Sequence, residues 1–481
     1  MRPPPRALAS ALALAALIGA YVVVFGTLTW RQQTNFGTFG FDMGIYDQGI
    51  WLLSRFKEPF DTIRGLNFFA HHVNVVALAF VPFYWLGAGP HFLYLSETIW
   101  MALGALPIWL LARDRLSSRW LPLGLAASYL LYPSLEWINW WHFHPDALII
   151  TPLLFAWWLA TRARWGWFSV AVAVALLCKE DAALAVAALG LTLAIRGRRR
   201  AGALTCLVGV GWFLLATKVI IPIANGGASP FYVQELFPGF GDSLSAILVN
   251  LITHPDRFFS LVTRPDRLTY YRQLLVPVAF MPLAAVEVLL IGLPQAAVNS
   301  ISGHALTHDI RYHYSSIVIA AIYLATVESC ARLGGRMAVR RLLVGLVLVA
   351  SLAANVVWSP SPIGRQYHSG IWTAAQPRHE VMRDALKLVP AAAGVSATYS
   401  LVPHLTHRVH IYEFPNPWVP TNWGASGENP PDPDTADYLV LDITLNGSQE
   451  ALYNRLVAPG GPFEIVFSEN GIVVARRVAP G

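Results

Sequence analysis

Charge is scarce in this sequence of 481 residues: 13% of them are Asp, Glu, Lys or Arg, whereas 55% are hydrophobic. A soluble protein of this length cannot bury so large an apolar fraction in one core. Cysteine is also rare, and Cys178, Cys206 and Cys330 lie inside apolar stretches without a CxxC pair. The cysteine pattern excludes a disulfide framework and a cysteine metal site. The apolar composition predicts an all-α membrane protein with many spans.

The basic residues gather in short connections between apolar runs. These connections are 113–119, 162–164, 196–200 and 332–341. Cytoplasmic loops of membrane proteins collect Lys and Arg, so the pattern favours orientation in a membrane over a groove for nucleic acid. We therefore expect the N-terminus and all four connections in the cytoplasm, and no nucleic-acid partner.

This orientation requires an even number of spans between neighbouring connections and predicts about 11 spans. The run Leu8–Leu28 is expected to be a retained first span, because no small-x-small cleavage site follows it. Parity further requires that 272–301 form two short spans broken near Pro282 to Glu287. The run 74–88 has both flanks outside, so we expect a re-entrant or interface-lying helix there.

Two domains are predicted. Residues 1–359 form the membrane domain, with a first outside loop at 30–90, and residues 360–481 have the charge, Pro and Gly content of a soluble domain. That second domain is expected to be a small extracytoplasmic α/β domain acting as a lid or substrate-handling module. Its expected elements are a helix at 378–388, strands at 395–398 and 438–441, and a hairpin of 464–467 with 471–474.

Polar clusters concentrate on the predicted outside. In the first loop, Asp42 and Asp47 lie in an amphipathic stretch, where Asp42 could cap a helix or act as a base beside a lipid headgroup. His72 follows in the same loop. A later hairpin carries His142, His144 and Asp146 among tryptophans typical of a membrane interface. The spacing of these histidines differs from a helical HExxH zinc site, so they are candidates for a metal or an acceptor without indicating either.

Three ionisable residues, Lys179, Glu180 and Asp181, interrupt an apolar stretch from Trp165 to Ile195. Charges at this depth are costly unless they pair or face a wet cavity. Each arm of about 13 to 15 residues reaches roughly 20 Å, so the tip is expected to be sunken inside a cavity. The alternative is an ordinary polar hairpin tip.

Arg311 and His313 enter another span from the outside. The guanidinium of Arg311 offers two parallel donors to a phosphate, although an isolated Arg at a span end is more often a snorkelling anchor. A site that combines a base with cations suits a ligand that carries a hydroxyl and a phosphate. Asp42 fits the base, and Lys179, Arg311, His313 and His72 fit the phosphate side.

Five segments together carry a family resemblance: FDMGIYDQGIW, HHVNVV, FHPD, CKEDAAL and RYHYS, in this order. They resemble the bacterial membrane proteins grouped as domain of unknown function 2079. That family is similar to the C-type glycosyltransferases (the GT-C fold), multi-span enzymes that take a sugar from a polyprenyl-phosphate carrier outside the membrane. The likeness runs from about residue 35 to 330 and extends to the outside domain.

The resemblance implies an inverting glycosyltransferase of the bacterial plasma membrane. Its partners would be a polyprenyl-phosphate sugar lipid and a glycan or lipid acceptor of the cell envelope. Asp42 matches the acid of the first outside loop in such enzymes, Asp47 is the second candidate, and Asp146 matches a further acid. A divalent cation, Mg or Mn, is expected between Asp42 and His or Asp partners.

Two other functions remain open. The sunken charge at Lys179 to Asp181 and the broken pair at 272–301 also suit a transporter or flippase of a lipid-linked substrate. A non-catalytic scaffold for envelope assembly is the third possibility, in which the outside domain binds a partner. The absence of an internal repeat in the hydropathy pattern, together with the one-sided polar clusters, favours the enzyme.

Overall fold

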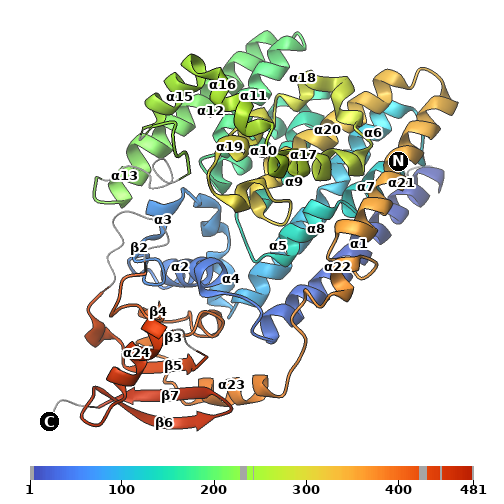
Figure 1. Ribbon diagram of the computed structural model, residues 1–481. Coiled ribbons are helices and arrows are strands. Elements are labelled where there is room, and N and C mark those ends of the chain that lie inside the picture. The colour runs from blue at the N-terminus through green and yellow to red at the C-terminus, as the bar shows by residue number, and fades with distance from the viewer. Residues whose placement is uncertain (1–4, 228–235, 242, 422–430, 445–446, 479–481) are drawn as a thin grey trace.

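The structure is a computed structural model that describes residues 5–227, 236–241, 243–421, 431–444 and 447–478. Helices predominate, and Figure 1 shows most of them gathered in one bundle, with a small sheet of late residues at the far end of the molecule. Elements of the first loop, drawn in blue, lie between bundle and sheet. The expected combination of a helical membrane region with a small C-terminal sheet is confirmed.

The helices of the bundle are mostly apolar, and the most polar of them spans Pro265–Leu275. They are α1 (Pro5–Thr34), α5 (Pro90–Leu103), α6 (Ala105–Leu116), α7 (Leu121–Leu130), α8 (Pro133–Trp140), α9 (Ile150–Thr161), α10 (Trp165–Cys178), α11 (Ala182–Ile195), α12 (Arg199–Leu215), α13 (Ile221–Ala224), α15 (Leu244–Thr253), α16 (Pro255–Val262), α17 (Pro265–Leu275), α18 (Val286–Leu289), α19 (Leu293–Ile301), α20 (Ser316–Leu333) and α21 (Met337–Trp358). Most of α20 is buried, whereas α1, α12 and α21 expose apolar side chains, as helices facing lipid do.

The predicted count of about 11 spans is not confirmed. Within the described residues, 5 helices are long and apolar enough to cross a membrane, or up to 6 if one bent pair counts as a span. Four predicted spans fold instead as shorter apolar helices: Leu121–Leu130, Ala147–Thr161, Trp165–Cys178 and Ala182–Ile195. At 1.5 Å per residue these helices are shorter than the roughly 30 Å hydrocarbon layer, so sequence runs alone do not establish spans.

The predicted irregular runs are irregular in the structure. In the run 272–301 the helix Pro265–Val278 meets Met281–Leu289 at 85°. The break falls at Ala279 and Phe280, both with positive φ, just before the predicted position. Run 74–88 contains two short helical pieces, Val75–Ala79 and α4 (Val81–Trp85), with no helix of spanning length.

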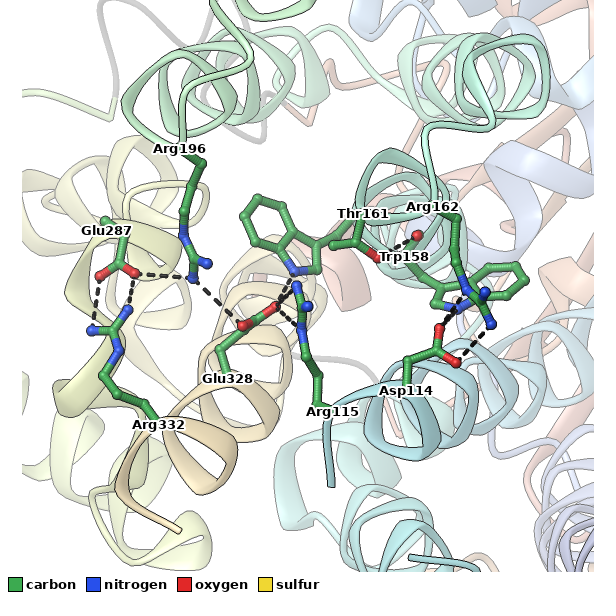
Figure 2. A network of polar contacts seen from close by, with 10 residues as sticks. Asp114, Arg115, Trp158, Thr161, Arg162, Arg196, Glu287, Glu328 and Arg332 are labelled. Atoms are coloured by element: carbon green, nitrogen blue, oxygen red, sulfur yellow. Dashed lines mark hydrogen bonds and ion pairs between the residues drawn. The ribbon is translucent and has the colours of Figure 1, made fainter. Parts of the chain in front are cut away.

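Arginines from all four basic connections lie at one end of the bundle (Figure 2). We call this set the arginine network; it comprises Asp114, Arg115, Trp157, Trp158, Arg162, Arg196, Glu287, Glu328 and Arg332. Glu328 accepts hydrogen bonds from Arg115 at 2.9 Å and from Trp157 at 3.1 Å, and Arg196 lies 3.5 Å away. Residues of the four connections therefore lie close together, and their cytoplasmic location stays a prediction.

The opposite ends of α10 and α11 carry Lys179, Glu180 and Asp181. Each helix has 14 residues, as expected for the arms of this hairpin, so its tip lies roughly 20 Å from the arginine network. Glycines pack α11 tightly against α12: a Cβ at Gly209 would lie 2.6 Å from the carbonyl oxygen of Ala183, and one at Gly190 2.4 Å from the nitrogen of Cys206. Such close backbone approach fixes the hairpin against α12.

The first loop packs on the C-terminal region rather than standing alone. It contains α2 (Ile45–Ser54), β1 (Phe60–Asp61), β2 (Leu66–Asn67), α3 (Phe68–His71) and α4. Phe36, Ile45 and Ile63 share a buried apolar cluster with residues of the late sheet, including Val395 and Val440. The position of the loop is therefore set by the domain that follows the bundle.

The late sheet has the order β4-β3-β5-β7-β6, with β3 parallel to β4 and β5 and the remaining pairs antiparallel. The predicted helix, strands and hairpin are all present, and β4 is an additional strand. The elements after the bundle are α22 (Arg365–His368), α23 (Arg378–Lys387), β3 (Val395–Ala397), β4 (Ile411–Glu413), β5 (Tyr438–Asp442), α24 (Gly447–Leu456), β6 (Phe463–Glu469) and β7 (Ile472–Arg477).

Candidate active site

A cavity of about 600 Å³ lies where the first loop, the α8–α9 connection, the α10–α11 tip and the late sheet meet. Most of the predicted site residues line it. They are Asp42, His72, His144, Asp146, Lys179, Glu180, Asp181 and His313.

Asp42 lies on a short π-helix, Gly40–Gly44, directly before α2. Its carboxylate faces two histidines: Oδ1 is 3.3 Å from His144 Nε2 and Oδ2 is 3.8 Å from His142 Nδ1. No side chain forms a capping hydrogen bond at the start of this helix, and Asp42 lies inside the helix, so it is not a helix cap. Instead the two histidines orient the carboxylate in the cavity wall.

The pKa of Asp42 is held well below its usual range. Burial raises this pKa, but the charge of His144 and the contact with His142 outweigh burial. Burial lowers the pKa of His142 despite Asp42, so His142 is a neutral partner at physiological pH. Asp42 is therefore ionised and ready to accept a hydrogen bond from a ligand.

The α10–α11 tip forms a second cluster in the same cavity. Lys179 Nζ lies 2.8 Å from Asp146 Oδ1 and 3.4 Å from Asp181 Oδ2. Burial lowers the pKa of Lys179, but Asp146 and Asp181 outweigh it and the pKa is raised; Lys179 is thus charged. The tip lines a cavity, as expected, and its charges are paired, whereas its depth below the membrane surface stays a prediction.

Histidines connect the tip to the other walls. His72 Nδ1 lies 2.7 Å from Glu180 Oε1, while the backbone N–H of Val73 donates to Glu180 Oε2 at 3.0 Å. His313 stacks on His144 with ring centroids 3.8 Å apart. Segments from the first loop, α8–α9, α10–α11 and the start of α20 therefore meet within one polar site.

Three predicted site residues, His142, Asp47 and Arg311, lie outside the cavity lining, although His142 contacts Asp42, which lines the cavity. Asp47 is fully buried, accepts a hydrogen bond from Tyr84 at 2.5 Å and another from Thr406, and contacts His407 at 3.2 Å. Its bonds tie α2 to the late domain. Arg311 is half exposed and pairs with Asp309 at 2.6 Å. The positions of Asp47 and Arg311 suit anchoring better than substrate contact.

Arg64 and Glu413, which the sequence did not single out, also line the cavity, as does His71 next to the predicted His72. Arg64 is buried, with its guanidinium 5.3 Å above the ring of Phe41, and His71 lies beside His72. Glu413, the last residue of β4, reaches the cavity from the late sheet. Arg64 lies seven residues before the start of the HHVNVV segment, which was the available signal for it, whereas β4 was not predicted.

A divalent cation was expected between Asp42 and His or Asp partners. Among the residues that the structure describes, no three His, Cys, Asp or Glu side chains are arranged to hold a metal ion. The divalent cation therefore stays a prediction, and no step is derived through one.

The lining of the cavity changes character along its length. Leu184, Phe213, Leu236, Phe237 and Val298 form an apolar wall beside α11, α12 and α19. Arg64, the histidines, Lys179 and Asp42 supply polar groups, and Glu413 and the ring of Tyr399 come from the late sheet. Such a lining suits a ligand with an apolar tail and a polar, anionic head.

Comparison with solved structures shows the fold of a known class. The crystal structure of ArnT from Cupriavidus metallidurans in the apo state aligns with a TM-score of 0.54 at 14% identity, covering 98% of this chain and 99% of that chain. The archaeal oligosaccharyltransferase AglB from Archaeoglobus fulgidus, in complex with an inhibitory peptide and a dolichol-phosphate, aligns with a TM-score of 0.38 at 12% identity, covering 96% and 74%. The likeness to ArnT confirms the expected GT-C fold.

The family is established by sequence. A model described as "Predicted membrane protein (DUF2079)" matches residues 33–474, so this chain belongs to that family. The match includes the cavity-lining residues named above. A search of curated proteins found no match.

Proposed function

We propose that this chain is a membrane glycosyltransferase that transfers a sugar from a polyprenyl-phosphate donor to a cell-envelope acceptor on the extracytoplasmic side. The observation that carries the proposal is Asp42: an ionised carboxylate, oriented by His142 and His144, in a cavity that also holds Lys179 and an apolar wall. The shared fold with ArnT agrees with a transferase of this class.

The donor would bind along the cavity. Its polyprenyl chain would lie against the apolar wall near Phe213 and Val298, next to α12, whose outer face is exposed. Its phosphate would meet Arg64 and His72, with Lys179 nearby. A planar guanidinium matches phosphate geometry well, which makes Arg64 the stronger candidate than Arg311 for this contact.

The reaction would be a single displacement that inverts the anomeric carbon. The acceptor hydroxyl would donate a hydrogen bond to Asp42 and attack the anomeric carbon, while the bond from that carbon to the phosphate oxygen breaks. A carboxylate of low pKa is a weak base, so Asp42 would take the proton late, when the attacking hydroxyl has become acidic. The polyprenyl phosphate leaves with its charge near Arg64 and Lys179.

The numerous acids of the cavity do not prevent an anionic donor from binding. Burial and neighbouring Glu180 raise the pKa of Asp181, and Lys179 is matched by Asp146. The phosphate would bind beside Arg64 and His72, whereas the carboxylate of Asp42 is directed at His142 and His144. Separation of the base from the leaving phosphate is what a displacement requires.

The test is transfer of labelled sugar from decaprenyl-phosphate sugar to an envelope extract by the purified full chain in lipid nanodiscs. Asp42→Ala should abolish transfer, a loss of at least about 10²-fold, with the melting temperature retained. Asp442→Ala, in β5 outside the cavity, is the matched control and should transfer normally. The enzyme assignment fails if correctly folded Asp42→Ala turns over like wild type.

A further inference from the structure

The late domain contributes two side chains to the cavity, and both come from the same edge of its sheet. β3 and β4 are parallel, with Ala397 paired to Glu413, so their carboxyl ends lie together. Glu413 ends β4, and Tyr399 follows β3 by two residues. Both line the cavity that also holds Asp42.

Contacts with the π-helix hold this edge close to Asp42. The backbone N–H of Gly40 donates to the carbonyl of Tyr399 at 2.8 Å. A Cβ at position 40 would lie 2.8 Å from Glu413 Oε2 and 2.9 Å from Val402 Cγ1, so only glycine permits this approach. The carboxyl of Glu413 thus lies against the segment that bears Asp42 two residues later.

One oxygen of Glu413 is without a partner. Oε2 is buried, and no hydrogen bond to it is formed within the described residues. A buried acceptor left unpaired is costly, and most such atoms in native proteins are satisfied by a ligand, an ion or water. Burial and then Asp42 raise the pKa of Glu413 to about 7, so near neutral pH this carboxyl can accept or donate a hydrogen bond.

Aromatic rings surround the two carboxyls. The ring of Tyr399 is 5.1 Å from that of Phe39, Phe39 is 6.3 Å from Trp141, and Trp141 is 4.6 Å from Tyr312. Tyr399 is 50% exposed, so its ring is free to contact a ligand. Sugar rings present C–H faces to aromatic rings and hydroxyls to carboxylates, whereas an anionic headgroup would be repelled by the two acids.

We propose that Glu413 and Tyr399 form the acceptor subsite, which binds a neutral, hydroxyl-bearing carbohydrate beside Asp42. The inference rests on the proposed function, since it divides the cavity between donor and acceptor. The phosphate of the donor belongs to the side of Arg64 and His72, and the acceptor sugar to the side of the late sheet. The late domain is then part of the substrate site and not only a cover.

The test is saturation-transfer difference NMR on the full chain in nanodiscs, with neutral methyl glycosides of common hexoses and pentoses as probes. At least one glycoside should give a signal with wild type. Tyr399→Leu and Glu413→Leu should weaken its binding by about tenfold, the equivalent of one charge-assisted hydrogen bond or ring contact. Glu464→Leu, on the exposed face of β6, is the matched control and should bind as wild type.

Glu413→Leu should fold, because it replaces an unpaired buried oxygen by an apolar group of similar size. Three results overturn the subsite: no neutral glycoside binds wild type, binding is unchanged in both variants, or only methyl glucosaminide binds, which would indicate a cationic acceptor.

A parallel melting experiment with decaprenyl phosphate separates this inference from the proposed function. We expect the lipid to stabilise wild type and Glu413→Leu equally. If the lipid stabilises neither protein while the glycoside signal depends on Glu413, the donor assignment fails and the carbohydrate subsite stands. If the lipid stabilises both wild type and Glu413→Leu, but glycoside binding is unchanged in the Glu413 and Tyr399 variants, only the subsite proposal fails.

Discussion

Charged residues concentrate at both ends of the α10–α11 hairpin, but they are paired in different ways at the two ends. At the arginine network, Glu328 contacts two arginines and a tryptophan, and Glu287 contacts Arg196 and Arg332 (Figure 2). At the cavity end, Asp42 and Glu413 line the cavity, Asp42 is paired with two histidines, and Glu413 Oε2 has no hydrogen-bond partner within the described residues. Matched charges hold helices together, whereas charges left facing a cavity are available to a ligand.

This contrast separates stability from activity. Removing a carboxylate from the arginine network leaves buried donors unpaired, so the fold should suffer. Removing one from the cavity leaves space that a ligand or water fills, so substrate handling should suffer instead. The predictions below test this division, from the largest expected effect to the smallest.

Glu328→Ala should produce the largest loss of stability. It leaves Arg115 and Arg196, each about one-third exposed, and the buried indole N–H of Trp157 without their shared partner, which should cost about 1–3 kcal/mol in the free energy of unfolding. Melting temperature in nanodiscs is the measurement, with Asp42→Ala as the cavity counterpart. Equal destabilisation by the two substitutions would remove the distinction between the two ends.

Arg64→Gln should weaken binding of decaprenyl phosphate by about tenfold, because a charged hydrogen bond to the phosphate is lost. Arg311→Gln should leave that affinity unchanged, since Arg311 lies outside the cavity lining and pairs with Asp309. Thermal shift against lipid concentration measures both. Arg64→Lys keeps the charge without the planar fork and serves as the folding control. Loss of binding in the Arg311 variant alone would reverse the assignment.

Glu413 should make stability depend on pH in a defined window. Its pKa is about 7 in the folded protein against an ordinary value of 4.5, so the folded state holds a proton that the unfolded state releases. The free energy of unfolding that protonation of Glu413 contributes is therefore lost as pH rises from about 4.5 to about 7. In Glu413→Leu that decline should be absent from a series of melting temperatures against pH. If melting temperature falls with pH in parallel for wild type and Glu413→Leu, the raised pKa of the buried Glu413 carboxyl is contradicted.

Asp442→Ala should have the smallest effect. Asp442 pairs with Arg378 at 2.9 Å, but Arg378 is 34% exposed, and surface pairs contribute about 0–1 kcal/mol. Sugar transfer and melting temperature should both stay near wild type. A large loss of transfer would show that the far side of the late sheet takes part in the reaction.

Much of the site could be predicted because its residues interrupt strong patterns. Lys179, Glu180 and Asp181 break an apolar run whose arms have the length that the structure shows. His144 and Asp146 lie at a hairpin top, and Asp42 begins the stretch after the first span. Charged residues within an apolar run are a local signal, so they can be recognised from the sequence without knowledge of the fold.

The remainder depends on contacts between distant segments. Asp47 binds Thr406, which lies more than 350 residues later, and this partner makes it an anchor. Glu413 reaches the cavity because a strand of three residues pairs in parallel with β3, and so short a strand leaves little pattern. The number of spans could not be predicted from apolar runs either, because the runs at 120–133 and 166–178 fold as short helices.

The fate of the glycosidic bond of the donor tests the central claim most directly. Proteoliposomes of the full chain would be incubated with labelled decaprenyl-phosphate sugar and an envelope extract, and the lipids and glycans then separated by mass. A glycosyltransferase should yield free decaprenyl phosphate and label on the acceptor in equal amounts. Recovery of the donor intact, whether moved across the bilayer or left in place, would contradict the account.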